Sequence, residues 1–74
     1  MTYQKDNAFY NLSNVSKITT TDTAWTSSTG QCYPGFTLHY LGEGYKYDTI
    51  SFNDKETRDK DLNDIIKIMN HVKV

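Results

Sequence analysis

The strongest constraint on the fold is a stripe of apolar side chains near the end of the chain. Its members recur at intervals of three and four residues, and they are Leu62, Ile65, Ile66, Met69 and Val72. This spacing places them on one face of an α-helix, which must bury that face against the rest of the chain. We predict a helix over residues 53–73 that begins at a capping box formed by Asn53 and Glu56. Arg58 is expected on the outer face of this helix, within reach of Asp54.

A β-hairpin is the clearest unit before this helix. Two runs of alternating side chains, 36–41 and 45–52, flank the loop Gly42-Glu43-Gly44, where glycine suits a tight turn. Side chains on a strand alternate between its two faces. We therefore expect one set of apolar side chains to face the core, namely Phe36, Leu38, Ile50 and Phe52.

The first half of the chain carries weaker strand patterns. Residues 9–12 form an aromatic and apolar run, and residues 15–25 are rich in β-branched side chains, so both favour strands. The Tyr-Pro-Gly run at 33–35 indicates an irregular connection, and residues 1–7 are a candidate flexible segment. The sequence therefore predicts one α+β domain over residues 1–74. In it a small antiparallel sheet of about four strands, arranged as a meander, is packed by one C-terminal α-helix.

Composition limits the environment in which the chain can work. Among 74 residues there is one cysteine, Cys32, so no disulfide can form within the chain, which favours a reducing compartment. No apolar run is long enough to span a bilayer or to serve as a secretion signal. We therefore expect a cytoplasmic protein with no membrane partner. Eight basic and nine acidic side chains give a formal net charge of −1, without the basic stripe that is typical of nucleic-acid binding.

The residue types that carry most chemistry are few and scattered. Cys32, His39 and His71 lack the paired spacing of a zinc site. The acidic run at 54–61 lacks the glycine of a calcium loop, and we interpret it as an exposed helix face. Nucleophilic catalysis would require a serine or Cys32 held against a base in a cleft, and the single thin core of so short a chain leaves little room for a cleft. We therefore expect no metal, no cofactor and no enzymatic activity.

Tyrosine stands out in the composition, with six copies in the chain. Tyrosine is favoured at protein interfaces because it offers a large contact area and a polar tip. We predict a partner-binding surface on the sheet that comprises Tyr40, Tyr45, Lys46, Tyr47 and Trp25. The leading interpretation is a protein-binding module. The alternatives are a single-stranded nucleic-acid or nucleotide binder that stacks bases on the tyrosines, and a self-associating homodimer whose contact includes Ile68 at the margin of the helix stripe.

Three segments carry a resemblance to a known class of proteins. These are Asn-Leu-Ser-Asn-Val-Ser-Lys-Ile at 11–18, the hairpin from Phe-x-Leu-x-Tyr at 36–40 to Ile-Ser-Phe at 50–52, and the helix entry Asn-Asp-Lys-Glu-x-Arg-Asp at 53–59. The chain resembles small phage and bacterial accessory proteins with a pleckstrin-homology-like organisation, in which a sheet is followed by a terminal helix. This resemblance covers most of the chain but supplies no site residues. It implies a phage or mobile-element protein that binds a host or phage protein, and that inhibits or modulates a host protein such as a defence protein.

Overall fold

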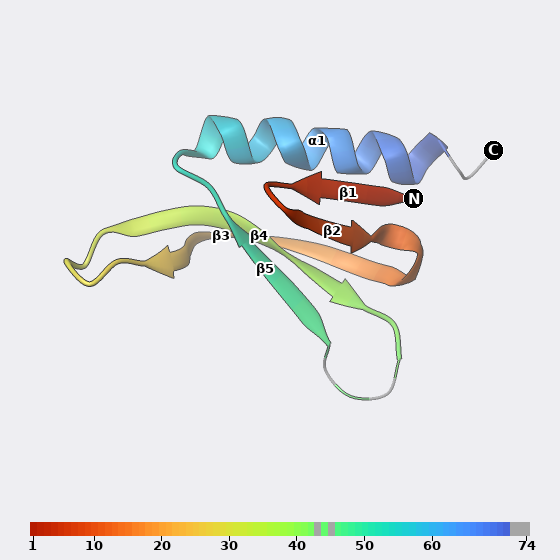
Figure 1. Cartoon of the computed structure of the whole chain (residues 1–74), viewed down its shortest axis with the longest axis horizontal. Helices are drawn as coiled ribbons and strands as arrows, with labels where there is room; N and C mark the ends of the chain where they lie inside the picture. Colours follow the sequence, from red (N-terminus) through yellow and green to blue (C-terminus); the bar gives the residue numbers. More distant parts are fainter. Residues whose placement is uncertain (43, 45, 72–74) are drawn as a thin grey trace.

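The chain folds into five strands, one 3-10 helix and one α-helix in the computed structural model, which describes residues 1–42, 44 and 46–71. In chain order these elements are β1 (Thr2–Lys5), β2 (Ala8–Asn11), η1 (Leu12–Asn14), β3 (Val15–Thr26), β4 (Cys32–Tyr40), β5 (Tyr47–Ser51) and α1 (Lys55–His71). The strands form two antiparallel sheets, and α1 runs alongside β1 (Figure 1). The predicted α+β class with one C-terminal helix is confirmed.

The N-terminal hairpin forms a small sheet of its own, so the strands are divided between two sheets instead of lying in one. Residues 1–7 contain β1, although their sequence marks them as a candidate flexible segment, and Tyr3 lies opposite Tyr10 of β2. Asp6 in the tight turn takes a φ of 54°, a left-handed value that aspartate adopts more readily than most residues. The Tyr3 and Phe36 ring centroids are 6.1 Å apart. The hairpin therefore covers part of the inner face of the second sheet.

The second sheet is a meander in the order β3-β4-β5. Pairing of β4 with β5 confirms the predicted hairpin, with Phe36 opposite Ile50 and Leu38 opposite Asp48. In the connection between these strands Gly42 and Gly44 both take positive φ values, whereas Glu43 of the predicted loop lies outside the described residues. All four residues that were predicted to face the core are buried, namely Phe36, Leu38, Ile50 and Phe52.

The Tyr-Pro-Gly run at 33–35 belongs to β4, so the prediction of an irregular connection is wrong. Pro34 lies where β5 has just ended, so the N–H that proline lacks is not needed by a ladder, while its carbonyl accepts a hydrogen bond from Phe52 N (2.8 Å). Gly35 is required by close packing, because a Cβ there would lie 2.0 Å from the carbonyl oxygen of Ile50. Both residues, which usually interrupt a strand, are therefore accommodated within β4, and Gly35 also allows β5 to approach closely.

Helix α1 closes the core with a stripe that differs slightly from the predicted one. Ile65 is fully buried, and Leu62, Ile68 and Met69 pack against the core. Ile66 is 41% exposed, so the prediction that it is buried is wrong. Ile68, which was expected at an exposed margin of the stripe, is instead half-buried and packs against the core, because the helix is rotated slightly from the predicted orientation. Over the residues described, no helix has the length and apolar character needed to cross a membrane.

Arg58 is buried, in contrast to the prediction that it lies on the outer face of the helix. Its guanidinium donates a hydrogen bond to the Thr21 carbonyl (3.3 Å) and lies 3.6 Å from the Asp22 carboxylate. A second donation runs to Asp59 (3.0 Å), whereas Asp54 is not among its ion-pair partners in the described part of the chain. A buried guanidinium needs such partners, because leaving it unpaired would be costly. This cluster fixes the start of α1 to β3.

The N-terminus of α1 is capped by Asp54 instead of the predicted Asn53. Asp54 Oδ1 accepts a hydrogen bond from Thr57 N (2.7 Å), and this bond lowers the pKa of Asp54 below its usual value. A carboxylate at this place also suits the positive end of the helix dipole. The described helix ends at His71, so residues 72 and 73 of the predicted helix lie outside the described residues.

Candidate binding groove between two strand edges

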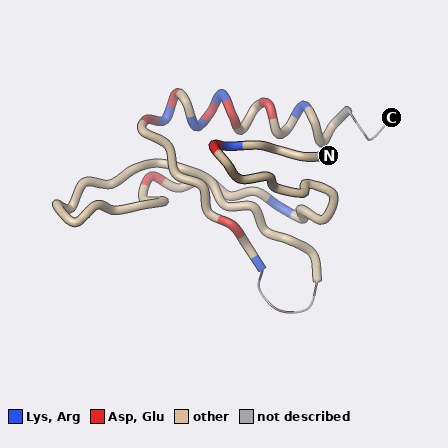
Figure 2. The backbone as a smooth tube through the Cα atoms, viewed as in Figure 1, with Lys and Arg blue, Asp and Glu red and all other residues tan. Residues whose placement is uncertain are grey.

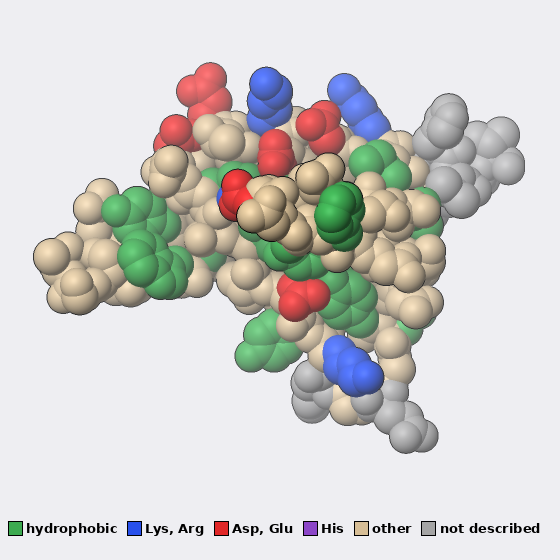
Figure 3. All heavy atoms as spheres, in the orientation of Figure 1, with side chains coloured by type: hydrophobic (Ala, Val, Ile, Leu, Met, Phe, Trp, Pro, Cys, Tyr) green, Lys and Arg blue, Asp and Glu red, His purple; other side chains and the backbone are tan. Residues whose placement is uncertain are grey.

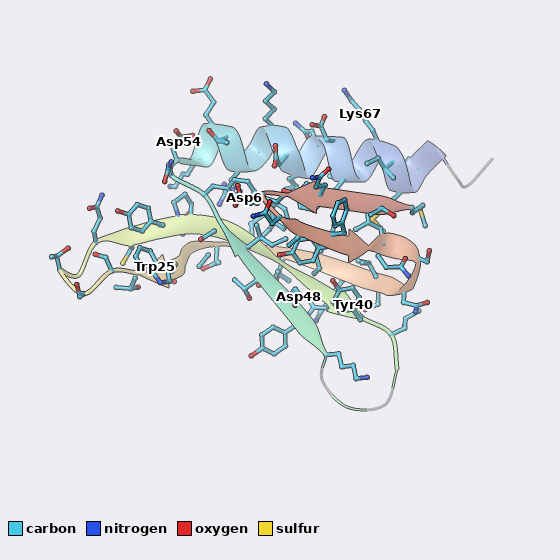
Figure 4. The ribbon with its side chains drawn as sticks, viewed as in Figure 1. Asp6, Trp25, Tyr40, Asp48, Asp54 and Lys67 are labelled. Atoms are coloured by element: carbon cyan, nitrogen blue, oxygen red, sulfur yellow. The ribbon has the colours of Figure 1, made fainter. Side chains whose placement is uncertain are left out.

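The structure places the predicted partner-binding residues in separate regions of the molecule. Tyr40 lies on the side of β4 that faces the core, and Tyr47 lies on the opposite side of β5. Trp25 lies near the end of β3, far along the sheet from Tyr40 (Figure 4). Lys46 precedes β5, and Tyr45 lies outside the described residues. No single surface unites the described members of this set.

Trp25 belongs to an aromatic pair at the projecting end of the β3–β4 hairpin. It lies opposite Tyr33 with ring centroids 5.1 Å apart, and it is 54% exposed. The pair lines a hollow of about 340 Å³ together with Lys5 and Phe52. Lys5 Nζ stands 4.7 Å above the Phe52 ring, which is a cation–π contact. The cation and one of the aromatic rings of this hollow are therefore already in contact with each other.

Tyr47 lies on a polar face of the three-stranded sheet. Its ring is 6.4 Å from that of His39, and the side chain is 62% exposed. The His39 Nε2 atom is 2.9 Å from Thr19 Oγ1, and the hydroxyls of Thr37 and Thr49 are 3.0 Å apart. Cross-strand polar pairs of this kind stabilise a solvated sheet face. This face offers one exposed aromatic ring among small polar groups.

A groove lies between β2 and β5, and residues from both strands line it. It consists of two hollows, of about 480 Å³ and about 290 Å³, that share Tyr10 of β2. Ile50 lines the larger hollow, while Tyr40 and Asp48 line the smaller one. The space-filling view of this side shows green apolar side chains beside the red carboxylates and blue cations (Figure 3). We call this feature the edge groove. Its lining includes Phe9, Tyr10, Tyr40, Leu41, Asp48 and Ile50.

The inner wall of the edge groove combines aromatic rings with one fixed carboxylate. The Tyr40 hydroxyl donates a hydrogen bond to Asp48 Oδ2 (2.8 Å). Burial, and then this hydrogen bond, raise the pKa of Tyr40 above its usual value. The phenol therefore stays protonated at neutral pH and holds the carboxylate in place. Asp48 keeps further acceptor capacity, because a carboxylate accepts several hydrogen bonds. Lys46 supplies a cation at the same end of the edge groove.

Two large apolar side chains stand at this end of the edge groove without being buried. Phe9 is 69% exposed and Leu41 is 67% exposed. Both line the hollow that also contains Tyr40 and Lys46. Exposed apolar groups beside a groove are typical of interaction sites, although single exposed apolar residues are common. Two of the residues that were predicted to bind a partner, Tyr40 and Lys46, line the edge groove, and their role in binding stays a prediction.

The edge groove offers apolar surface, hydrogen-bonding groups and charged side chains. Among the described residues, no three His, Cys, Asp or Glu side chains gather closely enough to hold a metal ion. Cys32 is exposed at the start of β4, and His39 lies on the polar face described above. Figure 2 shows basic and acidic residues interspersed along α1. The absence of enzymatic activity and of cofactors remains a prediction.

Sequence reasoning missed Phe9, Tyr10 and Asp48 as members of this site. Residues 9–12 were predicted as a strand, but the strand that pairs with it, β1, was not. The available signal was the alternation of Tyr3 and Lys5 before the tight turn with Ala8 and Tyr10 after it, which places these side chains on one face. With that pairing, Tyr10 becomes an inner-face residue.

Comparison of the chain with protein families, with curated proteins and with solved structures finds no match.

Proposed function

We propose that this chain is a non-catalytic protein-binding module that acts in the cytoplasm by forming a stoichiometric complex. The edge groove is its binding surface. As the resemblance of the sequence implies, the module is an accessory protein of a phage or mobile element, and its partner is a host protein whose activity it inhibits or modulates. The observation that carries this proposal is the edge groove itself, in which exposed Phe9 and Leu41 flank the Tyr40–Asp48 pair.

The composition of the edge groove supports protein as the partner. Binding energy at protein interfaces concentrates in a few aromatic or apolar anchors that are surrounded by polar groups. Phe9 and Leu41 provide such anchors, while Lys46 and Asp48 provide polar groups of opposite charge beside them. Single-stranded nucleic-acid binders instead combine stacking rings with a positively charged groove. The edge groove is lined by two cations, Lys5 and Lys46, and by two carboxylates, Asp6 and Asp48, which favours a partner of mixed charge.

Affinity capture from a bacterial lysate tests this function. The bait is the full chain, and the test variant is Phe9→Ser combined with Leu41→Ser. The matched control is Ile66→Ser, because Ile66 is also an exposed apolar residue but lies on α1 outside the edge groove. We expect one protein to be retained by the wild type and by the control, and to be lost with the double variant. Thermal melts confirm beforehand that all three baits are folded.

Two results would contradict the proposal. Equal recovery with the double variant would show that the edge groove is not the binding surface. Release of the captured material by nuclease at low salt would instead favour the nucleic-acid alternative, since phosphate contacts dominate such binding and weaken with salt.

A further inference from the structure

The free edge of β5 borders the edge groove, whose lining includes Thr49 and Ser51. In the β4–β5 ladder, Tyr40 N donates to the Lys46 carbonyl (3.0 Å), and Phe52 N donates to the Pro34 carbonyl (2.8 Å). Hydrogen-bonded and non-bonded pairs alternate along an antiparallel ladder, so the even-numbered residues of β5 bond to β4. The backbone groups on the other side, which are free of β4, belong to Tyr47, Thr49 and Ser51.

The free edge of β2 is arranged in the same way. Leu12 N donates to the carbonyl of Met1 (3.0 Å), so in this register Tyr3 and Tyr10 also form a bonded pair. The β2 residues whose backbone groups turn away from β1 are Phe9 and Asn11. Within the described residues, β2 and β5 are not hydrogen-bonded to one another. Two unpaired strand edges therefore border the edge groove.

We propose that the edge groove binds an extended segment of the partner protein as an added strand, hydrogen-bonded to β5 on one side and to β2 on the other. The inference rests on the proposed protein-binding function and names the kind of partner. An unpaired edge presents N–H and C=O groups at every second residue, and an extended peptide presents the complementary groups. The main chain then supplies affinity, and side chains supply specificity.

The occupant is an isolated segment because both of its edges must be free. A strand that enters between β2 and β5 needs unpaired backbone groups on each side. In a second copy of this chain every described strand is already paired on at least one side, β5 to β4 and β2 to β1. A folded copy can therefore add to one edge only. A tail or loop of a partner satisfies both edges.

The inner face of β5 specifies the side chains of that segment. In chain order this face presents Lys46, Asp48 and Ile50 at alternate positions. Directly opposite side chains on neighbouring strands interact most strongly, and opposite charges pair favourably. An antiparallel segment therefore carries an apolar residue opposite Ile50, then a basic residue opposite Asp48, then an acidic residue opposite Lys46. The intervening residues point to solvent and are of any polar type.

The probe is the capped peptide Thr-Val-Thr-Lys-Thr-Glu-Thr, titrated into the full chain labelled with ¹⁵N and followed by NMR. Its control is the peptide with Lys and Glu exchanged, which has the same composition. We expect saturable shifts and slowed amide exchange at Tyr47, Thr49 and Ser51, with smaller changes at Asp48 and Ile50, whose amides already bond to β4. The exchanged peptide is expected to bind at least about tenfold more weakly, because each charge then meets its like.

Thr49→Pro isolates the main-chain contribution. It removes an outward N–H while leaving the β4 ladder intact, and an edge strand tolerates proline at such a position. We expect the probe to lose at least about tenfold in affinity, because one of its carbonyls is left unpaired. Thr49→Val is the matched control, since it removes only the hydroxyl that lies 3.0 Å from Thr37 Oγ1, and it is expected to bind normally.

A second variant covers the case in which Thr49→Pro does not fold. Ligation of residues 1–31 to 32–74 at Cys32 gives a synthetic chain in which an ester replaces the amide between Asp48 and Thr49. The side chain is kept and the outward N–H is lost, while the Asp48 carbonyl becomes a weaker acceptor on the side of β4. Absence of saturable shifts with the probe, or equal affinity of the ester and amide chains, would overturn strand addition. The Thr49→Pro chain and the ester chain also serve as baits for affinity capture. If these two chains retain a partner that the Phe9–Leu41 double variant loses, the proposed function stands and strand addition is wrong.

Discussion

Ile65 and Ile66 are neighbours in α1 and have the same side chain, yet only Ile65 is part of the core. Ile65 is 0% exposed and Ile66 is 41% exposed. Truncating a buried isoleucine to alanine leaves a cavity and costs about 2–5 kcal/mol. We expect Ile65→Ala to lower the free energy of unfolding by that amount, and Ile66→Ala to change it by less than about 1 kcal/mol. Urea denaturation measures both free energies of unfolding. Equal losses in the two variants would show that α1 is rotated differently about its axis.

Gly35 carries a packing requirement that the sequence alone does not reveal. A methyl group at this position would contact the main chain of β5 at Ile50 and the Ala24 side chain. Gly35→Ala is therefore expected to destabilise the protein by about 1–3 kcal/mol, because the strands must move apart to accommodate it. Denaturant midpoints test this expectation. An unchanged midpoint would show that the sheet is less closely packed at this point.

These residues show why some positions were predicted and others were not. The apolar alternation of Phe36, Leu38 and Ile50 specifies a buried strand face by itself, and the structure confirms it. Pro34 and Gly35 were interpreted as a break because their local preference is for turns. Their actual role depends on where β5 ends and how closely Ile50 approaches. Such information lies in contacts between distant residues, which a local pattern does not contain.

At the scale of elements, the start of α1 depends on one carboxylate. The bond from Thr57 N lowers the pKa of Asp54, so Asp54 stabilises the helix while it is ionised. This contribution is present above the pKa of the unfolded chain, near 4, and it is lost as the pH falls through the lower folded value. We expect Asp54→Ala to lower the melting temperature at pH 7 and to have little effect at pH 2. Asn53→Ala is the control. If Asn53→Ala had the larger effect at pH 7, the capping box predicted from the sequence would be restored.

Strand β5 is expected to show alternating amide exchange in the free chain. The amides of Asp48 and Ile50 bond to β4, whereas those of Tyr47, Thr49 and Ser51 are turned away from it. Hydrogen exchange followed by NMR should therefore find slow exchange at the first pair and fast exchange at the other three. Uniform protection along β5 would mean that its outer edge is already paired, in a homodimer for example. A concentration series by sedimentation separates that case.

The element that sequence reasoning did not anticipate is β1, and the edge groove was missed with it. Tyr3 is the only buried apolar residue of β1, so residues 1–7 carry no hydrophobic run to indicate a strand. Its partner β2 was predicted from aromatic residues, but without β1 the inner orientation of Tyr10 had no basis. Tyr40 and Lys46 were identified because they lie on the hairpin with the strongest pattern. The side of the edge groove at β5 could therefore be predicted from the sequence, whereas the side at β2 could not.

At the scale of the whole molecule, polar contacts join α1 to both sheets. One of them is the ion pair in which Lys55 Nζ lies 3.4 Å from the Asp22 carboxylate. Near its start, Arg58 contacts Asp22 and the Thr21 carbonyl of β3. One turn further along, Asp61 accepts a hydrogen bond from the Tyr3 hydroxyl of β1 (2.7 Å). The helix is thus fixed to both sheets. Because β2 hydrogen-bonds to β1, the position of one wall of the edge groove depends on the Tyr3–Asp61 contact.

The Tyr3–Asp61 contact predicts how stability responds to alkaline pH. Burial, and then the hydrogen bond to Asp61, raise the pKa of Tyr3 well above its usual value near 10. The unfolded chain therefore loses this proton first, and the stabilisation that Tyr3 provides is fully present below about pH 10 and declines as the pH rises above it. Tyr3→Phe removes the hydrogen bond at a cost of about 0.5–1.5 kcal/mol at pH 7, since Asp61 remains in contact with water. Tyr40→Phe is the comparison, because the pKa of Tyr40 is also raised but Tyr40 does not contact α1 by a hydrogen bond.

Urea denaturation of the wild type and Tyr3→Phe between pH 7 and pH 11 measures this dependence. The wild type is expected to lose stability more steeply above pH 10, so the difference between the two proteins narrows there. If the free energies of unfolding of the two proteins changed in parallel with pH, the Tyr3 phenol would titrate alike in the folded and unfolded chains, which is incompatible with a buried hydroxyl bonded to a carboxylate.

The Tyr3→Phe substitution should also loosen β2, because β1 loses its polar link to α1. We therefore expect Tyr3→Phe to weaken capture of a partner through the edge groove even where the chain remains folded.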